Sequence, residues 1–272
     1  MGSGIAETAA VNGFEVVLRS RSQATADGTV DALEKSLNRQ VEKGKRTAEE
    51  RDAALARVTA TDDLHALKDV DLVIESVVED LEVKKELFRE LDRITADSTI
   101  LATNTSTLPV VELAIQTGRP GQVLGVHFFN PAPVMALVEL VRPLTASDET
   151  VAAARTFAEA CGKTPVEVKD QAGFIVNALL FPYLNNAIRL AEQGVASVAD
   201  IDTAMKGGCG FPMGPFALLD LVGLDTSLAI LDALYDEFRD PNYAAVPLLR
   251  RMVAADQLGR KSGRGFLDYT KK

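Results

Sequence analysis

Hydrophobic residues in the first 170 positions fall into short continuous runs, separated by amphipathic stretches. A run of four to eight apolar residues, often β-branched, is typical of a strand buried on both faces. Because these runs alternate with helical stretches, the pattern predicts a doubly wound, parallel α/β sheet of the Rossmann type. We expect the strands within residues 14–20, 69–77, 99–105, 122–131, 134–141 and 164–170.

The stretches between the runs carry apolar residues at helical spacing. Residues 3–12 hold small apolar side chains, and Gly13 is a helix stop because glycine tolerates the left-handed conformation. Residues 24–58 are amphipathic, and the charged "EKGKR" at 42–46 indicates a break that makes them a helical hairpin. In the helix at 82–94 the buried face is expected to hold Val83, Leu87, Leu91 and Ile94.

The pattern changes after residue 170, where every apolar stretch has a helical period. A helical region of about 100 residues is an ordinary size for a domain. We therefore expect two domains, an α/β domain at 1–170 and an all-helical domain at 171–272. The helical stretches are 174–194, 198–208, 215–238 and 246–259.

Composition narrows the function classes. Lys+Arg 29 against Asp+Glu 39 gives a net charge of -10, which argues against general binding of nucleic acids or anionic membranes. No apolar run approaches the ~18 residues of a membrane helix. The two cysteines, Cys161 and Cys209, match no disulfide or metal framework and suit the reducing cytoplasm.

The chain opens "MGSGIA", and Gly2 fits the last glycine of a dinucleotide fingerprint. Such glycines let backbone N–H groups approach a pyrophosphate at a helix N-terminus. A mobile N-terminus is the simpler interpretation of three such residues alone. The helix, Gly13 and the strand at 14–20 follow in the order of a βαβ unit, and this order favours dinucleotide binding by the first domain.

The cofactor depends on the residue at the end of that strand. A carboxylate there binds the ribose hydroxyls of NAD, whereas a small polar residue followed by arginine suits the 2′-phosphate of NADP. Here Ser20 takes the position, between Arg19 and Arg21, and the arginine fork suits phosphate. NADP is favoured over NAD, although two arginines at a strand end are also consistent with simple solvation.

The chain has two histidines. His65 lies among polar residues and is expected at the surface. His127 lies in an apolar strand, and Glu139 interrupts the next one, where a buried carboxylate is costly without a partner. A short connection would let the two strands pair, so that Glu139 orients the imidazole as a general acid/base. A neutral core histidine is the alternative.

At these residues the sequence resembles the L-3-hydroxyacyl-CoA dehydrogenase family, and among its members the short-chain 3-hydroxybutyryl-CoA dehydrogenases. The resemblance rests on "NTSTLPV", "GVHFFNPAPVMALVELV", "DQAGFIVNALLFPYLNNAIRL", "DIDTAMKGGCGFPMGPFALLDLVGLD" and "GRKSGRGFLDY", and it covers essentially the whole chain. It implies hydride transfer between a nicotinamide and C3 of a short (3S)-3-hydroxyacyl-CoA. Family members begin with a strand and the full glycine fingerprint, so the resemblance implies an N-terminal truncation that removes the first strand.

The same resemblance implies roles for individual residues. His127 would be the acid/base with Glu139 as its partner, and Ser106 and Asn177 would hydrogen-bond the substrate. A turn serine and a helix-capping asparagine are the alternatives for the last two. Glu79, Lys84, Asn104 and Asn130 would line the nicotinamide side, and Lys43 and Lys45 would meet the coenzyme A phosphates. Glu79 and Lys84 also fit a solvated helix start, and Lys43 and Lys45 also fit solvated surface charges.

Three other functions stay open at this point. A dehydrogenase of the same fold can act on a free hydroxy acid or sugar acid, the acyl group can be carried on an acyl carrier protein, or the chain can be a non-catalytic, truncated relative. The resemblance also implies a homodimer through the helical domain, where the apolar stretch 211–225 fits an interface or plain core. We expect no metal.

Overall fold

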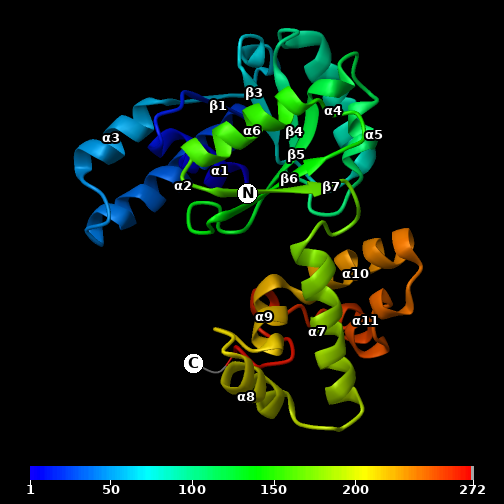
Figure 1. Ribbon diagram of the computed structural model, residues 1–272. Coiled ribbons are helices and arrows are strands. Elements are labelled where there is room, and N and C mark those ends of the chain that lie inside the picture. The colour runs from blue at the N-terminus through cyan, green and yellow to red at the C-terminus, as the bar shows by residue number, and fades with distance from the viewer. Residues whose placement is uncertain (271–272) are drawn as a thin grey trace. The chain divides into compact units, whose positions relative to one another are not determined.

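The computed structural model describes residues 1–270. Residues 271 and 272, the last two of the predicted second domain, lie outside the described residues. The chain divides into two compact units, Met1–Asp170 and Gln171–Lys272, shown in Figure 1. We call them the α/β unit and the helical unit. Within residues 1–270, no helix has both the length and the apolar character needed to cross a membrane.

The α/β unit alternates helices and strands along the chain. Its order is α1 (Gly2–Val11), β1 (Val16–Arg19), α2 (Gln23–Glu42), α3 (Ala48–Ala56), β2 (Val58–Thr61), η1 (Leu64–Leu67), β3 (Leu72–Glu75), α4 (Leu81–Ile94), β4 (Ile100–Thr103), α5 (Val110–Ala114), η2 (Pro120–Gln122), β5 (Val123–Phe128), β6 (Leu137–Arg142), α6 (Asp148–Ala160) and β7 (Thr164–Lys169). The predicted break at 42–46 lies between α2 and α3.

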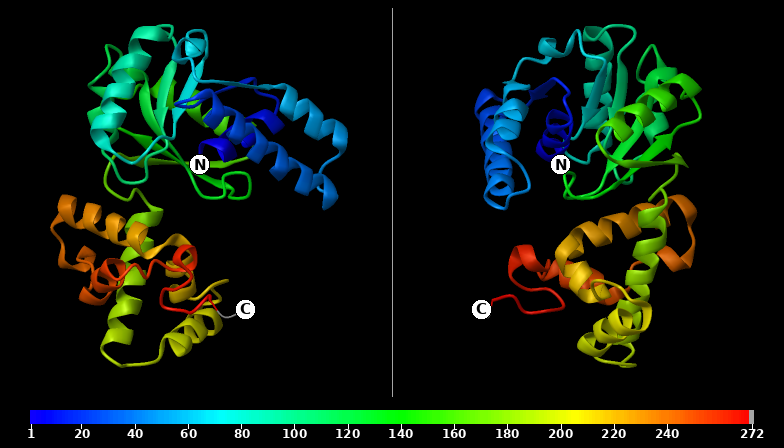
Figure 2. Two further views of the ribbon diagram at one scale, coloured as in Figure 1. Left: turned by 180° about the vertical axis from the view of Figure 1, so that it is seen from behind. Right: turned by 60° about the vertical axis from the view of Figure 1, so that its left-hand side comes forward.

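The strands form two sheets, a parallel pair β1-β2 and a five-stranded sheet β3-β4-β5-β6-β7. Helices lie on both faces of the larger sheet, α6 on one and α4 and α5 on the other (Figures 1 and 2). The expectation of a wholly parallel sheet was wrong in one place, because β5 and β6 pair antiparallel. The connection at residues 129–136 is too short for the crossover that a parallel pair needs.

Two local predictions also need correction. The strands predicted from sequence did not include β2, a four-residue strand that pairs with β1. On α4, Val83 is 46% exposed, whereas Lys84, Phe88 and Leu91 are buried. The buried face of α4 is thus rotated toward Lys84, whose aliphatic stem packs like an apolar residue.

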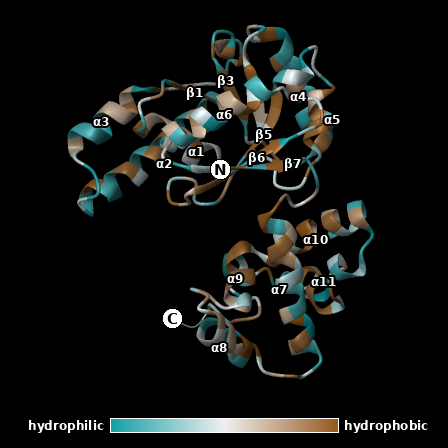
Figure 3. Cartoon of the chain, viewed as in Figure 1, coloured by the Kyte–Doolittle hydropathy of each residue, from teal (hydrophilic) through white to brown (hydrophobic). Residues whose placement is uncertain are grey.

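The centre of the larger sheet is apolar, as the brown strands β5 and β6 in Figure 3 show. Val126 and Phe128 of β5 are buried with Val138 and Leu140 of β6. At Gly125 an added Cβ would lie 2.7 Å from the Val141 Cβ, so only glycine allows this close approach. A tightly packed strand pair therefore surrounds the two polar side chains described below.

The helical unit contains α7 (Val176–Glu192), α8 (Val198–Cys209), α9 (Pro215–Val222), α10 (Leu224–Phe238), η3 (Pro241–Tyr243), α11 (Pro247–Ala254) and η4 (Arg260–Ser262). The long helix α7 packs against α9, α10 and α11 around buried Phe181, Leu184, Phe216 and Leu231. Just before α7, Gly173 has a φ of 74° and leaves no room for a Cβ beside Leu234.

Candidate active site

His127 and Glu139 form a buried pair in the middle of the larger sheet. They face each other in the antiparallel register of β5 and β6, and Nδ1 of His127 lies 2.8 Å from Oε2 of Glu139. Their side chains are only 7% and 1% exposed, and the Phe129 ring packs 4.6 Å from the imidazole between centroids. The carboxylate lies at Nδ1 and so orients the imidazole ring.

A second group of polar residues begins at Thr103, the last residue of β4, and comprises residues 103–106, which we call the serine loop. The Ser106 N–H donates to Oε1 of Glu79 at 3.0 Å, and the Thr105 hydroxyl donates to the same oxygen. The Asn104 side chain accepts a bond from the Phe128 N–H at 2.8 Å. The loop is thereby fastened to β5 at Phe128, the residue that follows His127.

Lys84 is enclosed in this network. Its Nζ lies 2.7 Å from Oε1 of Glu75 and 3.2 Å from Oε2 of Glu79, and its side chain is 1% exposed. The solvated interpretation is therefore wrong for Lys84, although Glu79 is 39% exposed. Sequence reasoning missed Glu75, whose side chain is fully buried. Its signal was an acid in an apolar strand, the same signal that identified Glu139.

The N-terminus of α1 contains Gly2, the glycine that the sequence predicts to be part of a dinucleotide fingerprint. Gly2 is its first residue, and Met1 at the N-cap makes no side-chain capping bond. An added Cβ at Gly4 would lie 3.2 Å from Pro133, so the helix start packs closely on the turn after Asn130. Backbone N–H groups at a helix start suit a pyrophosphate. Asn130 is exposed at this edge, beside a cavity of about 220 Å³ that it helps to line.

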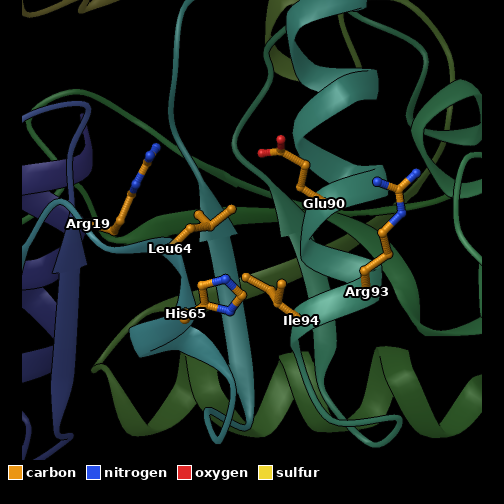
Figure 4. A pocket seen from close by; sticks show the side chains of 6 residues that line it. All are labelled: Arg19, Leu64, His65, Glu90, Arg93 and Ile94. Carbon is orange, nitrogen blue, oxygen red and sulfur yellow. The ribbon is translucent and has the colours of Figure 1, made fainter.

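Ser20 directly follows β1, and its N–H donates to the Thr61 carbonyl at 3.0 Å. Arg19 extends beside a second cavity, of about 330 Å³, and its Nε donates to the Asp62 carbonyl at 3.3 Å. Figure 4 shows that cavity with its lining residues Arg19, Leu64, His65, Glu90, Arg93 and Ile94. Arg21 is exposed, as is His65, which the sequence placed at the surface. The strand end therefore presents a small polar residue between two arginines.

The remaining predicted residues lie farther along the fold. Lys43 and Lys45 are exposed at the junction of α2 and α3. Asn177 is in the helical unit, where it is the second residue of α7 and is buried. His127, Glu139 and the serine loop thus lie in the α/β unit, and Asn177 lies in the helical unit.

This arrangement suits proton transfer at an oxygen next to a bound dinucleotide, and comparisons with known proteins agree with it. The model of the 3-hydroxyacyl-CoA dehydrogenase NAD-binding domain matches residues 1–171, and that of the family's C-terminal domain matches residues 173–269. A nicotinamide cofactor follows from the first match.

Relatives match over nearly the full length. The chain is 51% identical to a 3-hydroxybutyryl-CoA dehydrogenase of Mycobacterium tuberculosis, over 99% of this chain and 95% of that protein. It is 46% identical to one of Clostridioides difficile, over 100% and 96%. The crystal structure of (S)-3-hydroxybutyryl-CoA dehydrogenase from Ralstonia eutropha superposes with a TM-score of 0.97 at 44% identity, over 100% of this chain and 96% of that one. With both domains matched and relatives this similar, the chain belongs to the 3-hydroxyacyl-CoA dehydrogenase family.

Proposed function

We propose that this chain transfers a hydride reversibly between a nicotinamide cofactor and C3 of a short-chain (3S)-3-hydroxyacyl-CoA, as a 3-hydroxybutyryl-CoA dehydrogenase. The observation that carries the proposal is the buried His127–Glu139 pair, beside a serine loop and within a dinucleotide-binding fold. The names of the 46–51% identical relatives support the same substrate class.

In oxidation, Nε2 of His127 takes the proton of the C3 hydroxyl, and in reduction it returns that proton. Glu139, 2.8 Å from Nδ1, stabilises the imidazolium that forms. The Ser106 hydroxyl and the Asn177 amide hydrogen-bond the substrate's oxygens and align C3 for the transfer. Because His127 and Glu139 are both buried, water is excluded from the imidazole while it holds the proton.

The cofactor's pyrophosphate is held by the N-terminus of α1 at Gly2. Asn104, Asn130 and Glu79 line its nicotinamide side, and Lys84, being enclosed, contributes through Glu79. The nicotinamide supplies the two-electron chemistry when bound, and the protein supplies alignment and charge.

NADP is the cofactor that the strand end favours. Ser20 carries no negative charge to repel a 2′-phosphate, and exposed Arg21 is available to bind one. With NADPH as the reductant, the physiological direction is reduction of a short 3-oxoacyl-CoA.

The remaining assignments concern surfaces. Exposed Lys43 and Lys45, at the tip of the α2–α3 hairpin, are proposed to meet the phosphates of coenzyme A. We propose that the protein is cytoplasmic and forms a homodimer through the helical unit, which leaves several large apolar side chains exposed. These include Leu179, Leu190, Val195, Phe211 and Leu221.

The test is to follow the oxidation of NADPH and NADH with acetoacetyl-CoA, free acetoacetate and the acyl-carrier-protein thioester as substrates. We expect the highest kcat/KM with acetoacetyl-CoA. A preference for the free acid or for the carrier-bound thioester would replace the substrate assignment, and the absence of turnover with all three would refute the proposed function.

A further inference from the structure

Glu75 ends β3 with a buried side chain whose two oxygens are both engaged. Oε1 accepts bonds from Lys84 Nζ at 2.7 Å and from the Val77 N–H, and Oε2 accepts one from the Thr103 hydroxyl at 2.7 Å. Thr103 is the first residue of the serine loop. The carboxylate therefore joins the ends of β3 and β4 to the buried face of α4.

Lys84 carries this connection to a second carboxylate. Its Nζ also lies 3.2 Å from Oε2 of Glu79, whose other oxygen accepts the Ser106 N–H at 3.0 Å. Two hydrogen bonds and one ion pair thus connect Glu75 through Lys84 and Glu79 to the main chain of Ser106. A single buried ammonium group balances two carboxylates, so removing the charge of one changes the position of the other.

The serine loop depends on these carboxylates for most of its anchors. Its N-terminal end is fixed by the Thr103 hydroxyl on Glu75 and by the Asn104 N–H, which donates to the Glu75 carbonyl at 2.8 Å. Its C-terminal end is fixed by Glu79, which accepts from both Thr105 and Ser106.

Stability alone does not account for such a network. A buried ion pair is often no more stabilising than apolar residues of the same volume, because desolvation offsets the attraction. What the charged network provides is a defined position for the loop, since both oxygens of Glu75 accept hydrogen bonds and the ammonium lies within ion-pair distance of both carboxylates.

We propose that Glu75 is a positioning residue for the reaction: through Lys84 and Glu79, and through Thr103, it sets where the serine loop presents Ser106. This inference rests on the proposed function, in which Ser106 binds the substrate's oxygen. Glu75 itself is enclosed and touches neither substrate nor cofactor.

The first test is a double-mutant cycle on the full chain, with acetoacetyl-CoA and reduced cofactor. Glu75→Gln keeps the volume and removes the charge, and it should lower kcat about 10–100-fold because small misplacements of a binding group are costly. In a Ser106→Ala background the same change should cost less than about threefold, because the group that Glu75 positions is gone. Glu86→Gln, an exposed acid on α4, is the matched control and should leave kcat unchanged.

The second test does not require activity. In Glu75→Gln, amide hydrogen exchange at Ser106 should be at least about tenfold faster than in Glu86→Gln, since its acceptor Glu79 is released. A second pair of substitutions, at Thr103, keeps the test decisive if Glu75→Gln misfolds. Thr103→Val removes the hydroxyl that Glu75 holds and should show the same faster exchange, whereas Thr103→Ser retains the hydroxyl and should restore slow exchange.

Two results would overturn the positioning role. One is a loss of kcat in the double variant equal to the product of the losses in Glu75→Gln and Ser106→Ala. The other is unchanged hydrogen exchange at Ser106 in both Glu75→Gln and Thr103→Val. If the wild-type protein does not turn over the acyl-CoA substrate, the proposed function fails, and the exchange measurements still decide whether Glu75 positions the loop. The two failures are therefore distinguishable.

Discussion

Replacing Glu139 with glutamine tests how much the buried carboxylate contributes to proton transfer by His127. The substitution preserves the size of the side chain and a carbonyl oxygen near Nδ1, so it removes the negative charge with little change in packing. In the native protein the two side chains are 2.8 Å apart and nearly inaccessible to water. The imidazolium formed during oxidation would then lose its counter-charge.

The magnitude follows from this geometry. Two unit charges about 4 Å apart attract by about 4 kcal/mol at an effective dielectric constant of about 20. At about 1.4 kcal/mol per factor of ten, the full attraction corresponds to a rate factor of about 10³. Only the part of the charge developed in the transition state counts, so we expect kcat of Glu139→Gln to fall about 10²–10³-fold.

The assay is steady-state oxidation of (3S)-3-hydroxybutyryl-CoA, with Kd for the cofactor measured separately by nicotinamide fluorescence. Because Glu139 is 1% exposed and contacts His127, cofactor affinity should stay within about threefold of the wild type. Glu159→Gln, an exposed acid on α6, provides the matched control. A kcat within threefold of the wild type would show that the carboxylate does not stabilise the imidazolium.

Three further variants or probes test other parts of the account. Ser20→Asp should lower kcat/KM for NADPH by about tenfold or more and raise kcat/KM for NADH, since it places a carboxylate at the ribose position. A wild-type enzyme that already prefers NADH would contradict the cofactor assignment. Lys84→Met should lower the free energy of unfolding by about 3–5 kcal/mol, because it leaves Glu75 buried without its ammonium partner. An unchanged urea midpoint would refute this prediction. Burial raises the pKa of the Cys161 thiol to about 11 from 9.0, so below pH 9 its thiolate fraction is about 100-fold lower than normal. A disulfide reagent should therefore label exposed Cys209 first, and equal labelling rates would contradict the structure.

The pairing of His127 with Glu139 could be anticipated from sequence because both signals were local. An acid in an apolar strand demands a partner, and a short connection places the next strand beside it. The same reasoning, applied to Glu75, would have led to a buried cation. The cation itself is hard to identify from sequence, because lysine is a surface residue by default and the position of Lys84 on α4 fits a solvated helix start equally well.

Other features depend on contacts between distant segments. β2 lacks the continuous apolar run that marks the predicted strands, although Val58, Thr59 and Thr61 are β-branched, and it pairs with β1. The short connection between β5 and β6 favours antiparallel pairing, but the alternation of helices and strands along the rest of the domain predicts a parallel sheet. Ser106 illustrates the limit for the site, since the bond from its N–H to Glu79 joins residues 27 positions apart.

The most direct test of the central claim is the turnover of His127→Gln with acetoacetyl-CoA and reduced cofactor, beside His65→Gln as the exposed-histidine control. If His127 is the acid/base, its kcat falls about 10²–10⁴-fold while Kd for the cofactor is retained, and the control is unaffected. A kcat for His127→Gln close to that of the wild type would contradict the assignment of His127 as the group that carries the proton.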